Sequence, residues 1–154
     1  MTKFDFSEEK LTQVWTEKYG SVVKAIFAKS GTKLVSDTVE DLYGEYTGSV
    51  PVNAKGYDNI HPDGTKDEIK STSTILSNGS MRIGGLRGKA DLCDNLVIVD
   101  CANNRTSIIP SAVFFTEGKF YHSRDAHMFL WSGTYNENDT IQQKNTALFL
   151  KYEV

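Results

Sequence analysis

The hydrophobic pattern of this chain changes once, near residue 50, and this change constrains the fold more than any other feature of the sequence. Before that point, apolar residues recur three and four positions apart, which is the period of one side of a helix. After it, the spacing shortens toward two, which is the period of a half-buried strand. The sequence therefore predicts an α/β fold, in which a mixed central β-sheet is flanked by helices.

Two amphipathic helices are expected in the N-terminal third. The first spans 11–27, with a start signal in Ser7 and the acidic pair that follows it, and ends near residue 30. The second begins near residue 36 and ends at Gly48, because glycine readily takes the left-handed conformation that closes many helices. Both helices precede the change of period.

Five strands are predicted beyond residue 50, separated by Gly, Asn, Asp and Pro. They are 56–61, 66–73, 95–101, 106–115 and 146–153. The glycine-rich stretch 77–89 is expected to be the most flexible part of the chain. A chain of 154 residues, 39% of them hydrophobic, has the size of one compact domain. We expect a single domain with helices at about 8–47 and a hairpin and sheet at about 52–154.

Composition excludes a disordered chain and a membrane-spanning one. Charged residues make up 24% of the chain, and no apolar run approaches the length of a bilayer span. The N-terminus has no apolar segment of the kind that directs secretion, so a cytoplasmic location is expected. Cys93 and Cys101 lie eight residues apart in apolar surroundings, without a second cysteine pair for a zinc site, and are interpreted as buried thiols.

The formal net charge of −3 does not favour a nucleic-acid partner, because phosphate binding usually shows as a basic face. It does not exclude one either. Carboxylates that hold divalent cations count as negative in this sum, although the bound cation neutralises them. Net charge therefore understates the affinity of such a protein for a polyanion.

A tight hairpin is predicted at residues 56–73, around the turn sequence HPDGT. Pro62 fixes one backbone angle of the turn and Gly64 is free to take a positive φ. Asp63 is therefore a turn residue, which points away from the face that the two strands share. Asp58, before the turn, is the better candidate for a functional aspartate.

Three charged residues converge on one face of this hairpin. Glu68 and Lys70 are two positions apart and share a face, while Ile69 projects from the other. Pairing 56–61 with 66–71 brings Asp58 beside Glu68. Two carboxylates can hold a hard cation such as Mg²⁺, and a neighbouring lysine can stabilise charge on a phosphate. The set predicts phosphodiester hydrolysis.

With these residues the chain resembles the PD-(D/E)XK nucleases, which include type II restriction enzymes, some homing endonucleases and the mismatch-repair nicking endonuclease. The resemblance covers roughly residues 36–101. GYD at 56–58 is similar to the metal aspartate of the family, EIK at 68–70 to its acid-x-lysine element, and NLVIVD at 95–100 to the central strand that follows. Tyr57 stands where the family pattern has a proline.

The resemblance implies a restriction-endonuclease-like core and Mg²⁺-dependent, sequence-specific cleavage of double-stranded DNA, with Mn²⁺ as an alternative cofactor. In it Asp58 and Glu68 are the metal ligands, together with the backbone carbonyl of Ile69, and Lys70 completes the catalytic set. Restriction, homing and repair enzymes of this family would look alike at this level.

Many members of the family also place a glutamate on the preceding helix. Glu45 is assigned this catalytic role, because it lies three residues beyond Leu42 on the apolar side of the predicted helix and 13 residues before Asp58. Glu40 is the alternative. Asp37 with Glu40 three residues later matches an N-terminal capping box, which would give Glu40 a structural role.

Candidate DNA contacts are Ser71 and three cations of the glycine-rich stretch, which either reach phosphates or belong to a solvated loop. These cations are Arg82, Arg87 and Lys89. The histidines do not have the spacing of a metal site. His61 can only support a ligand, and His122 and His127 are assigned to structure or to DNA contact.

One metal site cuts one strand, so a double-strand break in a single encounter needs two copies of the chain. We therefore expect a homodimer or homotetramer on double-stranded DNA, with the first helix and the aromatic segment 120–131 as candidate interfaces. Two other functions remain open. One is a non-catalytic DNA-binding or assembly module on the same fold, and the other is an unrelated α+β domain with a surface ion cluster.

Overall fold

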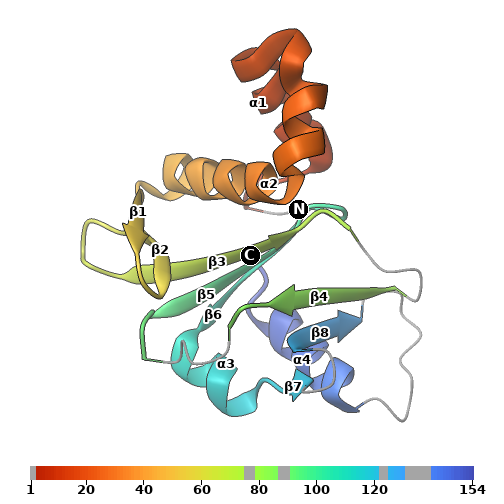
Figure 1. Cartoon of the computed structure of the whole chain (residues 1–154). Helices are drawn as coiled ribbons and strands as arrows, with labels where there is room; N and C mark the ends of the chain where they lie inside the picture. The colour runs from red at the N-terminus through yellow and green to blue at the C-terminus, as the bar shows by residue number, and fades with distance from the viewer. Residues whose placement is uncertain (1–2, 75–78, 87–90, 122–124, 131–139) are drawn as a thin grey trace.

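The chain folds into two β-sheets with helices on the outside (Figure 1). The computed structural model describes residues 3–74, 79–86, 91–121, 125–130 and 140–154. Its helical elements are α1 (Glu8–Tyr19), the 3-10 turn η1 (Gly20–Val22), α2 (Val23–Thr47), α3 (Ser111–Glu117) and α4 (Thr140–Lys151). Its strands are β1 (Val50–Ala54), β2 (Tyr57–Ile60), β3 (Lys66–Thr72), β4 (Ser80–Gly84), β5 (Asn95–Asp100), β6 (Arg105–Pro110), β7 (Phe120–Tyr121) and β8 (Ala126–Leu130).

The larger sheet has five strands in the order β1-β2-β3-β5-β6. Strands β3 and β5 run parallel, and the other neighbouring pairs are antiparallel. The predicted fold class, a mixed central sheet flanked by helices, is confirmed. The predicted hairpin corresponds to β2 and β3, so it lies inside this sheet.

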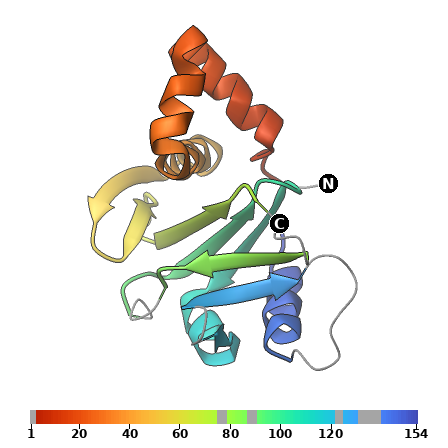
Figure 2. The ribbon, with the colours of Figure 1, turned by 45° about the vertical axis from the view of Figure 1, so that its right-hand side comes forward.

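The smaller sheet has three strands in the order β4-β8-β7. Figure 2 shows β4 beside β8, with α4 behind them. Its strands come from two distant parts of the sequence, because β4 lies between β3 and β5 along the chain whereas β7 and β8 follow α3.

Each face of the larger sheet packs against its own hydrophobic core. On one face, Ile69, Val97 and Val99 pack against residues of α1 and α2. On the other, Leu96 and Ile98 pack against the smaller sheet, α3 and α4. Since successive side chains of a strand point to opposite faces, Asp67 and Ile69 of β3 face α2, and Glu68 and Lys70 face the other way.

The N-terminal helices differ in their boundaries from those predicted. Ser7 caps α1 as expected, its hydroxyl accepting a hydrogen bond from the Lys10 N–H, but α1 ends at Gly20, where φ is +58°. The serine–glycine pair at Gly31 lies inside α2, which continues to Gly48. One glycine costs a helix interior only about 1 kcal/mol relative to alanine, so it need not end the helix. Both views show α2 changing direction along its length (Figures 1 and 2).

Two predicted strands are wrong in whole or in part. The segment 106–115 is a strand only as far as Pro110, and α3 follows directly. The segment 146–153 lies mostly in α4, where the buried residues Asn145, Leu148 and Phe149 have the three- and four-residue spacing of a helix. Strands β1, β4, β7 and β8 were not predicted, and β4 falls in the glycine-rich stretch.

Cys93 and Cys101 are free and buried, as predicted. Burial raises the pKa of the Cys101 thiol to about 12 and also raises that of Cys93. Both thiols therefore stay protonated near neutral pH. Among the helices of the described part of the chain, none has the length and apolar character needed to cross a membrane.

Candidate active site at the β2–β3 hairpin

The turn between β2 and β3 has the geometry that its sequence predicts. The Gly64 N–H donates to the His61 carbonyl at 2.9 Å, and Gly64 has a φ of +90°. The Thr65 N–H donates to Asp63 Oδ1 at 2.9 Å. The hydrogen bonds from Thr65 lower the pKa of this exposed aspartate. Asp63 therefore stabilises the turn and lies outside the candidate site.

Asp58 lies just beyond the paired positions of β2 and β3. The register of these antiparallel strands pairs Asn59 with Asp67 and Ile60 with Lys66. Asp58 also reaches across the gap between the strands, because its Oδ2 accepts the Ile69 N–H at 2.8 Å. The carboxylate of Asp58 is thereby fixed to the strand that carries Glu68.

Lys70 completes this face of the hairpin. Its Nζ lies 3.3 Å from Glu68 Oε1, and the Glu68 side chain is almost fully buried whereas Lys70 is partly exposed. Gly85, with a φ of +73°, passes close by, and a Cβ atom at that position would lie 3.4 Å from Lys70 Nζ. No local pattern in the sequence connects Gly85 with the hairpin, because it follows β4 of the second sheet.

The two glutamates considered for the helix acid, Glu40 and Glu45, differ in their surroundings, and the assignment of Glu45 stays a prediction. Burial raises the pKa of Glu40 to about 7, with further upward contributions from the charges of Asp58, Asp37, Asp41 and Glu68 in that order. Glu45 is exposed. The two glutamates are five residues apart, which turns them about 140° from each other around the helix.

The capping-box interpretation of Asp37 and Glu40 is wrong, because α2 begins well before these residues. Because α2 begins at Val23, both residues lie in its interior, far from any free helix N-terminus. Asp37 instead forms an ion pair with Lys33 one turn earlier, at 2.9 Å. This frees the Glu40 carboxylate from a capping role.

The donors at the hairpin have the chemistry that a hard cation prefers. Asp58 and Glu68 are carboxylates of β2 and β3, whereas Glu40 belongs to α2, which packs on the face of the sheet opposite to Glu68. The raised pKa of Glu40 comes first from burial and then from the charges of the surrounding carboxylates, and a cation would offset the second cause. Within the described residues, however, no three His, Cys, Asp or Glu side chains converge closely enough to hold a metal ion.

Other predicted contacts are spread over the molecule. Arg82 is exposed on β4. Ser71 pairs with Val99 and so lies on the α2 side of the sheet, away from Glu68 and Lys70. The remaining predicted residues Arg87, Lys89 and His122 lie outside the described residues.

His127 is buried in the second core rather than exposed for DNA contact. Its ring lies 4.6 Å from that of Phe114 and 5.4 Å from that of Phe120, measured between centroids. Burial lowers its pKa to about 4. It is therefore neutral at pH 7 and packs as an aromatic side chain.

A hydrogen-bond network that was not predicted occupies the opposite face of the hairpin. Asp67 Oδ2 accepts the Tyr43 hydroxyl at 2.5 Å and lies 2.6 Å from His61 Nε2, and Asp67 Oδ1 accepts the Asn95 amide at 3.0 Å. These residues border a cavity of about 460 Å³. The network ties α2, the turn and β5 to β3.

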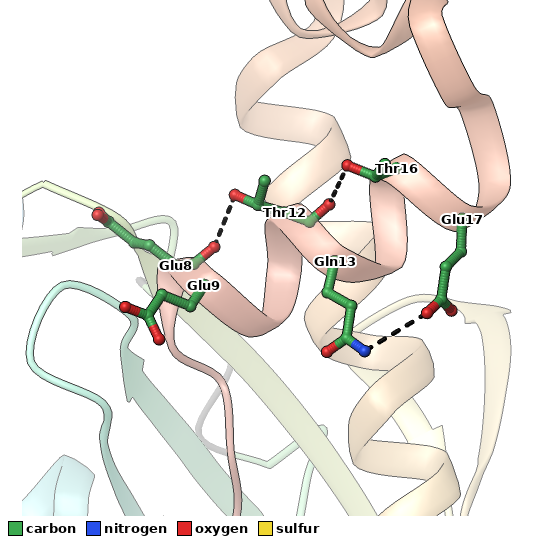
Figure 3. A pocket seen from close by; sticks show the side chains of 6 residues that line it. All are labelled: Glu8, Glu9, Thr12, Gln13, Thr16 and Glu17. Atoms are coloured by element: carbon green, nitrogen blue, oxygen red, sulfur yellow. Dashed lines mark hydrogen bonds between the residues drawn. The ribbon is translucent and has the colours of Figure 1, made fainter.

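An acidic groove lies on α1, far along the chain from the hairpin. Figure 3 shows Glu8, Glu9 and Glu17 along it, with the hydroxyls of Thr12 and Thr16 turned back to carbonyls of their own helix. The groove measures about 620 Å³. Its carboxylates would repel a phosphate backbone, so this face does not suit a nucleic acid.

Fold and site together define a mixed α/β protein with carboxylates and a lysine gathered at one hairpin of its central sheet. A scan against protein-family models finds none that matches the chain, and a search of curated proteins finds no significantly similar sequence.

Proposed function

We propose that this protein is a metal-dependent endonuclease that hydrolyses phosphodiester bonds in double-stranded DNA. The observations that support this most directly are the hydrogen bond that fixes Asp58 Oδ2 to the Ile69 N–H of β3 at 2.8 Å and the ion pair of Lys70 with Glu68 at 3.3 Å on the same strand. The charges of Asp58 and Glu68 also act on Glu40 of α2.

Asp58 and Glu68 would hold the cation, for which Mg²⁺ is the proposed identity and Mn²⁺ an alternative. The N–H and C=O of one strand residue point to the same side of the strand, so the Ile69 carbonyl points toward β2, as its N–H does. When bound, such a cation supplies Lewis-acid polarisation of the phosphate and a more acidic water. Glu40 adds negative charge near Asp58 from the α2 side of the sheet.

Lys70 would stabilise the charge that develops on the phosphate oxygens. Its ammonium is a compact point charge with three donors, and its side chain is held beside Glu68 on a central strand. A charge placed beforehand on a rigid element stabilises the transition state without reorganisation during the reaction. The neighbouring Glu68 holds the ammonium group of this lysine in place.

The alternative is an ion cluster without catalytic function. The direct pair between Lys70 and Glu68, and the lack of a three-ligand group in the described residues, favour this second candidate. Titration of the metal-free protein with Mg²⁺ or Ca²⁺ separates the two. A carboxylate site raises Tm with metal concentration by mass action, whereas a cluster already neutralised by lysine gives no shift at millimolar metal.

Nuclease activity also sets the expected assembly and location. Two copies placed across the duplex are needed to cut both strands in one encounter, so we propose a homodimer or a homotetramer. A cytoplasmic location would give it access to DNA. Light scattering of the free and DNA-bound protein measures the oligomeric state directly.

The test of function is digestion of a long DNA of known sequence in Mg²⁺. We expect the native chain to cut and the variants Lys70→Ala and Asp58→Asn to lose cleavage while remaining folded. Asp63→Asn is the matched control, because this exposed aspartate acts in the turn. Ends that share a palindrome indicate a restriction enzyme, one long site a homing enzyme, and random ends a non-specific nuclease. Cleavage by Lys70→Ala at the native rate would refute the assignment.

A further inference from the structure

We propose that a groove between α3 and α4 binds the phosphate backbone of duplex DNA. This lysine groove, defined by Lys119, Lys144 and Lys151, measures about 480 Å³. The inference deepens the proposed function, on which it rests for the identity of the polyanion. It concerns a surface that neither the hairpin nor the glycine-rich stretch includes.

The charge of the lysine groove is strongly biased for a chain whose net charge is −3. Among the described residues that line it, three are lysines and one, Glu117, is acidic. All three lysines are exposed, so their ammonium groups can reach a ligand. A polyanion is the partner that such a surface attracts, since each phosphate neutralised releases condensed counterions from the DNA.

Two of the three lysines lie on helix α4. Lys144 and Lys151 are seven residues apart on α4, which places them on the same side of the helix about 10 Å apart along its axis. Ala147 lies between them and keeps this side of the helix shallow, while the buried Leu148 forms the floor. A backbone strand can therefore approach α4 closely between the two ammonium groups.

The third lysine is fixed to the same helix by a buried amide. Asn145 Oδ1 accepts the Lys119 N–H at 2.7 Å, and Asn145 Nδ2 donates to the Lys119 carbonyl at 2.8 Å. Asn145 has no exposed surface. This pair of hydrogen bonds holds the backbone of Lys119 against α4, so its side chain starts from a defined position at the edge of the groove.

The lysine groove and the candidate active site lie on the same side of the larger sheet. Leu148 of α4 belongs to the core that covers Leu96 and Ile98, which is the face that Glu68 and Lys70 share. The acidic groove of α1 belongs to the helices of the other face. The lysine groove is therefore on the side of the larger sheet away from the acidic helix α1.

The test is equilibrium binding of a short fluorescent duplex, followed by anisotropy in the absence of divalent metal so that cleavage plays no part. The variant Lys119→Gln/Lys144→Gln/Lys151→Gln removes three charges and keeps the stems of similar length. We expect roughly tenfold to hundredfold weaker binding, and a plot of log K against log salt that is flatter by roughly 0.9 for each phosphate that the variant no longer neutralises.

The matched control removes three lysines from the N-terminal helices, as Lys10→Gln/Lys18→Gln/Lys33→Gln. Because the change in net charge is the same, this control should bind like the native chain if the location of the lysines matters. Equal loss of affinity in both triple variants, or native-like binding and salt dependence in the first, would overturn the proposal. Lack of any duplex binding by the native chain would also overturn it.

Failure of this inference and failure of the nuclease proposal give different results. A chain that binds duplex through the lysine groove but cuts no DNA in Mg²⁺ retains this inference and loses the enzymatic one. If the chain cuts DNA equally well with and without the three lysines, the nuclease proposal stands and the lysine-groove inference fails.

Discussion

Asp67 and Glu68 are neighbours on β3, are 1% and 2% exposed, and carry the same functional group, yet their surroundings are opposite in kind. Asp67 accepts hydrogen bonds from the Tyr43 hydroxyl and the Asn95 amide and pairs with His61. Glu68 forms an ion pair with Lys70, and the Asp58 carboxylate accepts the N–H of the next residue, Ile69.

The difference teaches how to separate a structural carboxylate from a functional one. A buried carboxylate needs donors to replace the water it has lost. Where the donors come from three other elements, as at Asp67, the carboxylate links these elements and stabilises the fold. A carboxylate grouped with others of its charge is costly to the fold by itself, and that cost is reasonable where a cation or a charged transition state completes the site.

The largest difference is expected between isosteric changes at these two positions. Glu68→Gln should lower cleavage about 100- to 1,000-fold, the usual effect of removing one electrostatic group from an active site, and should change stability little. Asp67→Asn should cut DNA normally once folded. Initial rates of DNA cleavage, compared at equal folded fractions, measure this difference. Equal rates for the two variants would contradict the distinction between a functional Glu68 and a structural Asp67.

Stability should show the opposite order. Asp67→Asn leaves donors of its network without a charged acceptor, so we expect it to lower the free energy of unfolding by about 2 to 4 kcal/mol. Urea unfolding followed by fluorescence gives this value. Tyr43→Phe removes one donor from the same network, and the destabilisation of the double variant should fall short of the sum of the two single changes.

The comparison extends to a buried base, His127, which is surrounded by aromatic rings. Its folded pKa of about 4 lies below the ordinary value of 6.5, so the unfolded chain takes up the proton first. Stability should therefore fall as pH drops from about 6.5 to about 4, by up to about 3 kcal/mol from this group. Urea unfolding across that range should show the slope, and His127→Phe should remove its share of it.

The smallest expected effect is at Glu40. Glu40→Gln removes the charge that burial and Asp58 make unfavourable, so the metal-free protein should become more stable by about 1 kcal/mol near pH 8. The same change should reduce the rise of Tm with Mg²⁺. Thermal unfolding with and without metal measures both, and a Glu45→Gln control should match the native chain in each.

The sequence predicted the hairpin well because its information is local. The turn residues act within five positions, and the alternation of side chains along a strand fixes that Glu68 and Lys70 share a face. The mixed sheet and the capped start of α1 at Ser7 were predictable for the same reason.

What could not be predicted depends on distant parts of the chain. The capping role predicted for Glu40 depended on whether α2 is continuous, which a single Ser–Gly pair does not decide. The helical state of α4 depends on its packing against β8, and the Asp67 network needs Tyr43 and Asn95, which are 24 and 28 residues away along the chain. The pairing of β4 with β8 spans about fifty residues, from Ser80 to Leu130.

That last pairing has a consequence for a chain emerging from the ribosome. The face of β3 that meets α2 can be covered as soon as β5 is made, because α1, α2 and β1 to β3 all precede it. The opposite face, with Leu96, Ile98 and the Glu68–Lys70 pair, has to wait for β8 and α4. During synthesis the half of the molecule that carries Glu68 and Lys70 is thus closed later than the half that meets α2, and its apolar surface stays open to chaperones until α4 has been made.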